Sequence, residues 1–314
     1  MKYLKPLIVI VGPTAAGKTD VAIELARMVR GEVVSADSML VYRGMDIGTA
    51  KPTKEEMGGI PHHLMDVVEP DQEFSVARYQ RLAEQSISGI SDRGRLPLLV
   101  GGTGLYVRAV IDHYDFSEAP KDDGIREKLK IESENIGPVG MHAKLAEVDP
   151  ITAGRLHPND LRRVIRALEV YHQTGKPISQ SENNKQSEPK YELHMFGLTM
   201  DRKLLYQRIE QRVDLMVKLG LVEEVKGLMG KYGNMGTAMQ GLGYKEIALY
   251  LEGKTSLEEA LELLKRNTRR FAKRQLTWFR ADKRIKWIEL EKFNNKKEVA
   301  NEIGQQIAGE LSIV

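Results

Sequence analysis

The sequence predicts an α/β protein with a parallel sheet and an inserted helical segment. In residues 1–115 and 190–314, short runs rich in Val, Ile and Leu alternate with amphipathic helical patterns. Residues 116–189 keep helical patterns but lose the strand-like runs. Alternating strands and helices are typical of a parallel sheet, and a helix-only stretch between two such parts is typical of an insertion.

The first apolar run, Leu7–Val11, leads into a glycine-rich motif and then into a helical pattern over Asp20–Val29. The motif reads G-x-x-x-x-G-K-T and consists of Gly12, Pro13, Thr14, Ala15, Ala16, Gly17, Lys18 and Thr19. Between a strand and a helix, this motif is typical of a phosphate-binding loop. The backbone N–H groups, the helix N-terminus and the lysine attract anions, and the threonine hydroxyl can bind Mg²⁺. The alternative is a chance glycine-rich turn, but the strand, lysine and helix together favour a polyphosphate site.

The second predicted strand, Glu32–Ser35, is followed by Asp37. Because ligands bind at the carboxyl edge of a parallel sheet, Asp37 is expected to face the phosphate loop; an Asp that merely caps a turn is the alternative. Residues 39–52 are too mixed for a helix or strand, and a long loop at this edge is usually functional. Pro61–Val67 predicts a further strand. The strand Leu96–Val100 lacks the terminal Asp of a Walker B element, which argues against a routine ATPase.

Composition bounds the class of protein and its partners. The chain has 314 residues, 41% of them hydrophobic and 29% charged, and no cysteine, so disulfides and thiolate metal sites are excluded. No stretch reaches the roughly 18 apolar residues of a membrane span, and no signal-peptide core follows Met1; we expect a cytoplasmic protein with no membrane partner.

The net charge of +3 is unevenly spread, because residues 261–286 hold ten Lys and Arg against two acidic residues. This asymmetry indicates an anionic partner. The helix predicted after Ser256 mixes these cations with aromatics, which suits an RNA backbone, although the aromatics could instead pack inward. Arg162, Arg163 and Arg166 share a face of a predicted helix over Asn159–Gln173; an ordinary solvated face is the alternative.

Taken together, the motifs resemble the bacterial tRNA dimethylallyltransferases, or isopentenyl-tRNA transferases. The phosphate loop alone is generic, but the stretch DSMLVYRGMDIGTAKP is highly specific, and the matches run in family order over most of the chain. Without cysteine, the chain lacks the zinc finger that eukaryotic relatives often carry. The matching stretches are GPTAAGKT (12–19), DSMLVYRGMDIGTAKP (37–52), GGTGLY (101–106), NDLRRVIRALEV (159–170), RIEQRV (208–213), GLGYKE (241–246) and TRRFAKRQLTWFR (268–280).

The resemblance implies a P-loop nucleotide-kinase-like core over residues 1–115 and 190–314, with an inserted helical tRNA-binding domain over 116–189. It implies transfer of the dimethylallyl group from dimethylallyl diphosphate to the exocyclic amine of an adenosine. That adenosine lies 3′ of the anticodon in tRNAs that read codons beginning with U, and diphosphate is released. The expected partners are the tRNA anticodon stem-loop, the prenyl donor and Mg²⁺ bound through Thr19, and the expected state is a monomer.

The same resemblance implies roles for individual residues. Asp37 is the candidate catalytic base, the phosphate loop with Lys18 and Thr19 holds the donor diphosphate, and Arg212 reaches it. Where the family often has an arginine, this chain has Gln240, so a charge contact is not expected there. The residues implied to contact tRNA are Asp37, Ser38, Met39, Leu40, Thr103, Arg126, Arg162, Arg163, Val164, Ile165, Arg166, Gln240, Gly241, Leu242, Gly243, Tyr244 and Lys245.

Three other functions fit parts of the sequence: a small-molecule or nucleotide kinase, an adenylate isopentenyltransferase acting on free nucleotides, and an RNA-binding P-loop protein without transferase chemistry. The absent Walker B Asp weighs against ATP hydrolysis. The basic insertion weighs against a free-nucleotide acceptor.

Overall fold

The computed structural model describes residues 4–112, 122–181, 188–233 and 235–309. The chain forms two compact units, which we call the core unit (residues 1–111 and 190–314) and the helical unit (residues 112–189). The boundary predicted between residues 115 and 116 lies outside the described residues.

The core unit is built on one sheet in which every strand pair is parallel, with the order β3-β2-β4-β1-β5-β6. This confirms the predicted α/β class. The central strand β1 pairs with β4 and β5, so that Val11 lies level with Gly101 on one side and Gly197 on the other. The carboxyl ends therefore meet at one edge. The strands are β1 (Lys5–Val11), β2 (Gly31–Ser35), β3 (His62–His63), β4 (Leu96–Gly101), β5 (Tyr191–Thr199) and β6 (Lys286–Glu289).

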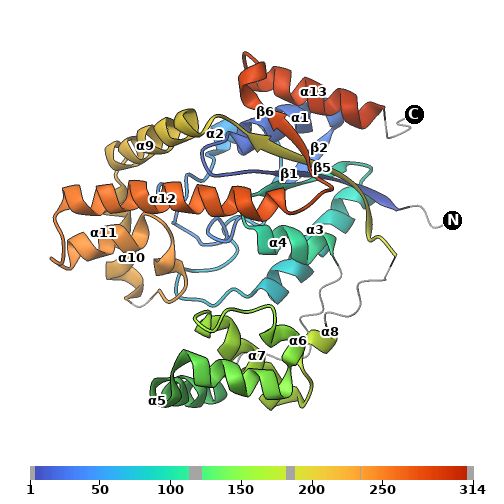
Figure 1. Cartoon of the computed structure of the whole chain (residues 1–314). Coiled ribbons are helices and arrows are strands. Elements are labelled where there is room, and N and C mark those ends of the chain that lie inside the picture. The colour runs from blue at the N-terminus through green and yellow to red at the C-terminus, as the bar shows by residue number, and fades with distance from the viewer. Residues whose placement is uncertain (1–3, 113–121, 182–187, 234, 310–314) are drawn as a thin grey trace. The chain divides into compact units, whose positions relative to one another are not determined.

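Helices cover both faces of this sheet (Figure 1). Ile8 and Ile10 point to the face packed by α1 and α13, whereas Leu7, Val9 and Val11 point to the face packed by α3 and α4. Alternate residues of one buried strand thus fill two cores. The helices of the core unit are α1 (Lys18–Val29), α2 (Lys54–Met57), α3 (Val76–Asp92), α4 (Gly104–Ile111), α9 (Arg202–Lys218), α10 (Leu221–Tyr232), α11 (Tyr244–Leu251), α12 (Leu257–Arg280) and α13 (Lys296–Ala308), with the short 3-10 helices η1 (Ala238–Gln240) and η2 (Leu290–Lys292).

The loop after β2 has neither helix nor strand over residues 36–53, as the sequence predicts. It is nevertheless ordered by burial, because Val41, Tyr42 and Met45 pack into a third apolar cluster with side chains of α9, α10, α11 and α12. Lys51 fixes its far end by donating to the Tyr42 carbonyl at 2.9 Å and pairing with Asp46 at 2.6 Å. The loop is therefore held at the carboxyl edge of the sheet.

The strand predicted over Pro61–Val67 is mostly wrong. Only His62 and His63 pair with β2, and the chain then turns through Leu64 (φ 64°) and Asp66 (φ 54°). A left-handed backbone at two such positions cannot continue a strand.

In the described part of the helical unit, four helices pack around a core of their own. Leu129, Met141 and Leu145 of α5 face Val164 and Leu168 of α7 in this core. The helix α5 is interrupted at Gly137 (φ 69°) before Pro138. The helices are α5 (Asp123–Val148), α6 (Pro150–Ala153), α7 (Leu161–Thr174) and α8 (Ile178–Ser181).

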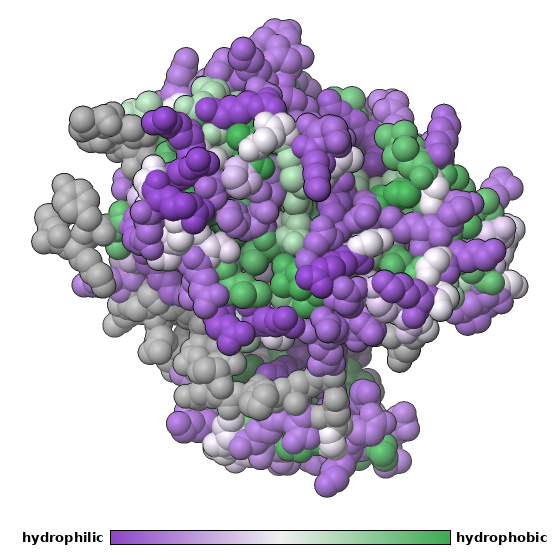
Figure 2. All heavy atoms as spheres, turned by 180° about the vertical axis from the view of Figure 1, so that it is seen from behind, coloured by the Kyte–Doolittle hydropathy of each residue, from purple (hydrophilic) through white to green (hydrophobic). Residues whose placement is uncertain are grey.

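No helix in the described part of the chain is long and apolar enough to cross a membrane. Figure 2 shows one face of the molecule, on which hydrophilic side chains predominate and hydrophobic ones form separate groups.

Candidate active site

The glycine-rich motif forms a tight turn between the buried strand β1 and the helix α1, which begins at Lys18. Gly12 (φ 147°) passes so close to β5 that a Cβ there would lie 2.6 Å from the Leu198 carbonyl oxygen. Gly17 (φ 77°) brings the chain into the helix. Both positions need glycine, and together they turn the loop amides and the positive end of α1 toward the carboxyl edge of the sheet.

Two cations and a carboxylate meet at this edge. Burial lowers the pKa of Lys18 to about 8, with the nearby Asp37 opposing the shift and Arg212 reinforcing it. The Lys18 ammonium donates to the Pro13 carbonyl at 2.8 Å. Burial also lowers the pKa of Arg212, while Asp37 and Asp20 act in the opposite direction. These groups form a positively charged site that an anion would stabilise.

Asp37 follows β2 and has two structural roles. Its Oδ1 accepts the backbone N–H of Met39 at 2.8 Å, which is the turn-capping role given above as the alternative. The same side chain also lines a cavity with the loop residues Thr14 and Ala15. Beside it, Thr103 accepts the Ser38 backbone N–H at 3.0 Å, joining the loops after β2 and β4.

This cavity has a volume of about 290 Å³ and gathers most of the core-unit residues expected for the acceptor base. Three of the expected residues, Leu40, Gly243 and Tyr244, do not line the cavity. Of the phosphate loop, only Thr14 and Ala15 are among its lining residues. Tyr244 is fully buried. The predicted residues that line the cavity are Thr14, Ala15, Asp37, Ser38, Met39, Thr103, Arg212, Gln240, Gly241, Leu242 and Lys245; those that the prediction missed include Gly48, Thr49, Ile209, Met216, Thr268, Phe271 and Arg274.

Glu224 of α10 supports this cavity from behind and was missed by sequence reasoning. One carboxylate oxygen accepts the backbone N–H groups of Asp46 (3.0 Å) and Ile47 (2.7 Å). The other accepts the N–H of Gly48 (3.0 Å) and the hydroxyl of Tyr244 (2.6 Å). Burial, reinforced by Glu224, raises the pKa of Tyr244 far above its usual range, so this hydroxyl remains a donor. A lone Glu in an amphipathic helix gives no sequence signal for such a role.

Gln275 of α12 is a second supporting residue that the sequence did not reveal. It is buried, and its carbonyl oxygen accepts the backbone N–H of Thr14 at 2.8 Å. Its amide group donates to the Gly102 carbonyl at 2.9 Å. One side chain therefore ties the phosphate loop to the loop after β4.

The arginines of the helical unit divide into two groups. Arg126 (2.7 Å) and Arg166 (3.1 Å) pair with Glu169, a fully buried carboxylate. Burial alone would raise the pKa of Glu169, but hydrogen bonds from Arg126, the Asp122 backbone and Arg166 lower it. These two arginines thus have a structural role.

The other members of the implied RNA-contacting segment lie on both sides of α7. Arg162 and Arg163 are exposed, with Arg163 3.3 Å from Asp160. Val164 and Ile165 are buried in the core of the helical unit. The side chains of these two apolar residues therefore stabilise the fold and do not present themselves to a partner.

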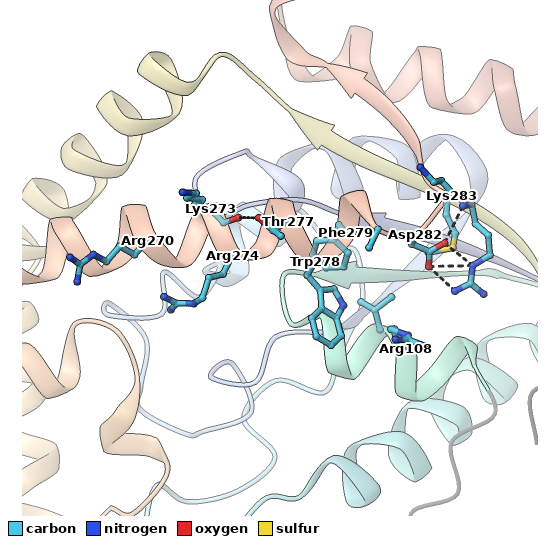
Figure 3. Close-up of a pocket in the computed structure, with 13 residues that line it drawn as sticks. Arg108, Arg270, Lys273, Arg274, Thr277, Trp278, Phe279, Asp282 and Lys283 are labelled. Carbon is cyan, nitrogen blue, oxygen red and sulfur yellow. Dashed lines mark hydrogen bonds and ion pairs between the residues drawn. The ribbon is translucent and has the colours of Figure 1, made fainter. Parts of the chain in front are cut away.

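A larger cavity of about 960 Å³ lies along α12 (Figure 3). Arg270, Lys273 and Arg274 of α12 line it, and they are exposed. The sequence left open whether the aromatic side chains of this helix pack inward. Phe279 does, since it is 3% exposed, whereas Trp278 does not, since it is 40% exposed. Other cations of the helix are neutralised, since Lys265 pairs with Asp214 and Arg269 with Glu210.

Similarity to known proteins is found over nearly the whole chain. A family model described as IPP transferase matches residues 40–282, and one described as isopentenyl transferase matches residues 5–69. A protein of Desulforamulus reducens named tRNA dimethylallyltransferase is 69% identical over 280 residues, which cover 89% of this chain and 99% of that protein.

Solved structures agree with these sequence matches. The tRNA isopentenylpyrophosphate transferase of Bacillus halodurans superposes with a TM-score of 0.74 at 48% identity, covering 98% of this chain and 97% of that one. A eukaryotic dimethylallyltransferase, described as acting on tRNA, superposes with a TM-score of 0.77 at 33% identity over 91% of this chain and 74% of its own. The chain therefore belongs to the IPP transferase family.

Proposed function

We propose that this protein is a tRNA dimethylallyltransferase. It moves the dimethylallyl group from dimethylallyl diphosphate to the exocyclic amine of the adenosine 3′ to the anticodon, in tRNAs that read codons beginning with U, and releases diphosphate. The observation that carries the proposal is a cavity lined by Asp37, Arg212 and the phosphate-loop residues Thr14 and Ala15. Relatives up to 69% identical bear the same name, which supports the tRNA acceptor over a kinase or a free nucleotide.

The phosphate loop and its cations hold the leaving group. As the bond from the allylic carbon to the diphosphate oxygen breaks, negative charge grows on the diphosphate, and Lys18, Arg212 and the loop amides are placed to stabilise it. Because the pKa of Lys18 is about 8, its ammonium is mostly charged at neutral pH. Removal of one such contact typically slows a reaction by about 10²–10³.

A divalent cation, Mg²⁺ in our proposal, fits the donor set of this site. The described residues contain no cluster of three His, Cys, Asp or Glu side chains that could hold a metal. Mg²⁺ does not need one, because it keeps several waters and binds through substrate phosphates with few protein ligands. The Thr19 hydroxyl, in the first turn of α1, would be the protein ligand. When bound, the ion would neutralise charge on the diphosphate.

Asp37 acts on the acceptor. The exocyclic amine of adenine is a weak nucleophile because its lone pair is delocalised into the ring, and its proton becomes acidic as the new N–C bond forms. A carboxylate within hydrogen-bond distance can orient the amine and accept that proton. To reach the cavity the adenosine leaves the anticodon-loop stack, at a cost of a few kcal/mol. Ser38, Met39, Thr103 and the turn beginning at Gln240 would surround it.

RNA binding is assigned to exposed cations of both units. Arg162 and Arg163 of the helical unit and the face of α12 with Arg270, Lys273 and Arg274 would contact phosphates, which position an RNA without reading its sequence. We propose that the protein acts as a monomer on cytoplasmic tRNA.

The test is incubation with labelled dimethylallyl diphosphate and either tRNA or AMP. We expect label on tRNA alone; label found only on AMP would refute the tRNA acceptor. Asp37→Ala should keep the affinity for tRNA and lose nearly all turnover. Lost tRNA binding with normal turnover at saturation would show that Asp37 binds RNA and is not the base.

A further inference from the structure

Lys296, the first residue of α13, lies directly against the phosphate loop. A Cβ added to Gly17 would overlap the Lys296 ammonium and would come within 3.0 Å of its Cε. The nearest carboxylate oxygen to the same point belongs to Asp20, at 3.5 Å. The space that glycine leaves open at the end of the loop is thus taken by a lysine from a helix nearly 280 residues away in sequence.

The helix that carries this lysine is firmly anchored. Val299, Ala300 and Ile303 of α13 are buried in the same apolar cluster as Leu25 and Ala26 of α1, which is the helix that follows the phosphate loop. The side chain of Asn295 caps the helix by accepting the Glu298 backbone N–H at 3.0 Å. The position of Lys296 relative to the loop therefore depends on two helices packed against each other.

The Lys296 ammonium lies in an electrostatically unfavourable position. Lys296 is the first residue of α13, and a cation at a helix N-terminus is destabilised by the helix dipole. Partial burial lowers the pKa of Lys296, Arg208 adds to the shift, and Asp20 opposes it. Among the described residues, no hydrogen bond or ion pair to this ammonium is found, whereas the neighbouring Lys18 donates to Pro13. A local electrostatic cost of this kind is typically offset by a functional gain.

We propose that Lys296 is a further diphosphate ligand, donating to a phosphate oxygen of the prenyl donor at the end of the loop marked by Gly17. The assignment rests on the proposed function, because it needs the diphosphate to sit in the phosphate loop. Lys296 then completes a set of cations with Lys18 and Arg212, each from a different helix. A bound diphosphate would relieve the repulsion between Lys296 and Arg208, since it supplies charge of the opposite sign.

The experiment measures binding of inorganic pyrophosphate, with Mg²⁺ present, to the full chain and to variants by calorimetry. Lys296→Met keeps an unbranched apolar side chain and removes the ammonium, and we expect pyrophosphate to bind about 10- to 100-fold more weakly, as for loss of a hydrogen bond to a charged group. Lys296→Arg keeps the charge and should recover most of the affinity. Lys297→Met, at the exposed neighbouring position, is the matched control and should bind as the parent does.

Two further readouts separate ligand binding from a structural role. Without ligand, Lys296→Met should unfold at the same temperature as the parent or higher, while the rise in Tm on adding pyrophosphate shrinks. In prenyl transfer, the KM for dimethylallyl diphosphate should rise and the KM for tRNA should stay unchanged.

Parent-like pyrophosphate affinity in Lys296→Met, combined with a lower Tm without ligand, would overturn the proposal and indicate a lysine that merely balances Asp20. The proposed function would survive that result if Lys18→Met still lost pyrophosphate binding. If the parent itself binds no pyrophosphate, both the lysine and the diphosphate site are refuted.

Discussion

Replacing Glu224 by Gln tests whether the loop at residues 46–48 is held in place by a charge. The carboxylate accepts four hydrogen bonds from Asp46, Ile47, Gly48 and Tyr244. In glutamine, one of the two oxygens becomes an NH₂ group that faces donors, so two of the four bonds are lost and the other two lose their charge.

The magnitude follows from these contacts. A hydrogen bond to a charged group contributes about 1.5–3 kcal/mol, so two of them amount to about 3–6 kcal/mol. Glu224 is only partly buried, so water replaces some of the loss, and we expect the loop to be destabilised by about 2–4 kcal/mol. The next residue, Thr49, accepts a hydrogen bond from Arg212 at 3.3 Å. Loosening the loop thus also frees the arginine assigned to the leaving group.

Two assays follow the effect. Hydrogen exchange should show faster exchange of the amides of residues 46–48, and kcat/KM for dimethylallyl diphosphate should fall by about 30- to 1,000-fold, corresponding to the same free energy. Glu223→Gln is the matched control, since Glu223 is the exposed neighbour on the same helix and should leave both values near those of the parent. Unchanged exchange together with a large loss of activity would refute the reasoning, because the effect would then not pass through the loop.

Two other predictions concern charge. A lysine binds an anion through its charged form, so affinity for pyrophosphate should hold below pH 8 and fall above it, as Lys18 (pKa about 8) loses its proton. A calorimetric pH series should show this fall near pH 8 in the parent, whereas Lys18→Arg, whose charge does not titrate in this range, should show a much smaller one; an identical series in both proteins would contradict this assignment. Replacing Arg162 and Arg163 by Glu should raise the KM for tRNA and weaken the dependence of this KM on salt concentration. An unchanged Tm would exclude misfolding of the variant. Unchanged kinetics would indicate that this face of the helix is ordinary solvated surface.

Local pattern was enough to predict most of the fold. The alternation of Leu7–Val11 and Leu96–Val100 with helical segments predicts a parallel sheet, since β-strand and helix periods are local properties. Pro61–Val67 failed because apolar composition does not reveal the left-handed backbone of Leu64 and Asp66. Helical spacing could have placed Val164 and Ile165 in the core, since they lie on the face of α7 opposite Arg162 and Arg163.

The supporting residues of the site could not be predicted from pattern. Glu224, Gln275 and Glu169 look like ordinary polar residues of amphipathic helices, and their roles depend on contacts with backbone groups or arginines far away in sequence. The same holds for Lys296, because its proximity to Gly17 arises only when the chain folds. Motifs identify the groups proposed to bind phosphate, whereas tertiary packing determines which residues hold those motifs in place.

Gln275 has a consequence for redesigning acceptor preference. The helix α12, which carries Gln275, also contributes Thr268 and Phe271 to the cavity wall. The cavity wall and the contact that ties the loops together therefore depend on the same helix. A substitution at Phe271 that shifts α12 would also shift Gln275 and its hydrogen bond to Thr14, so we expect changes to this wall to affect the phosphate loop as well. Attempts to change the acceptor should therefore vary Met39 or Leu242 on the cavity wall. Among the described contacts, neither side chain is hydrogen-bonded to the phosphate loop.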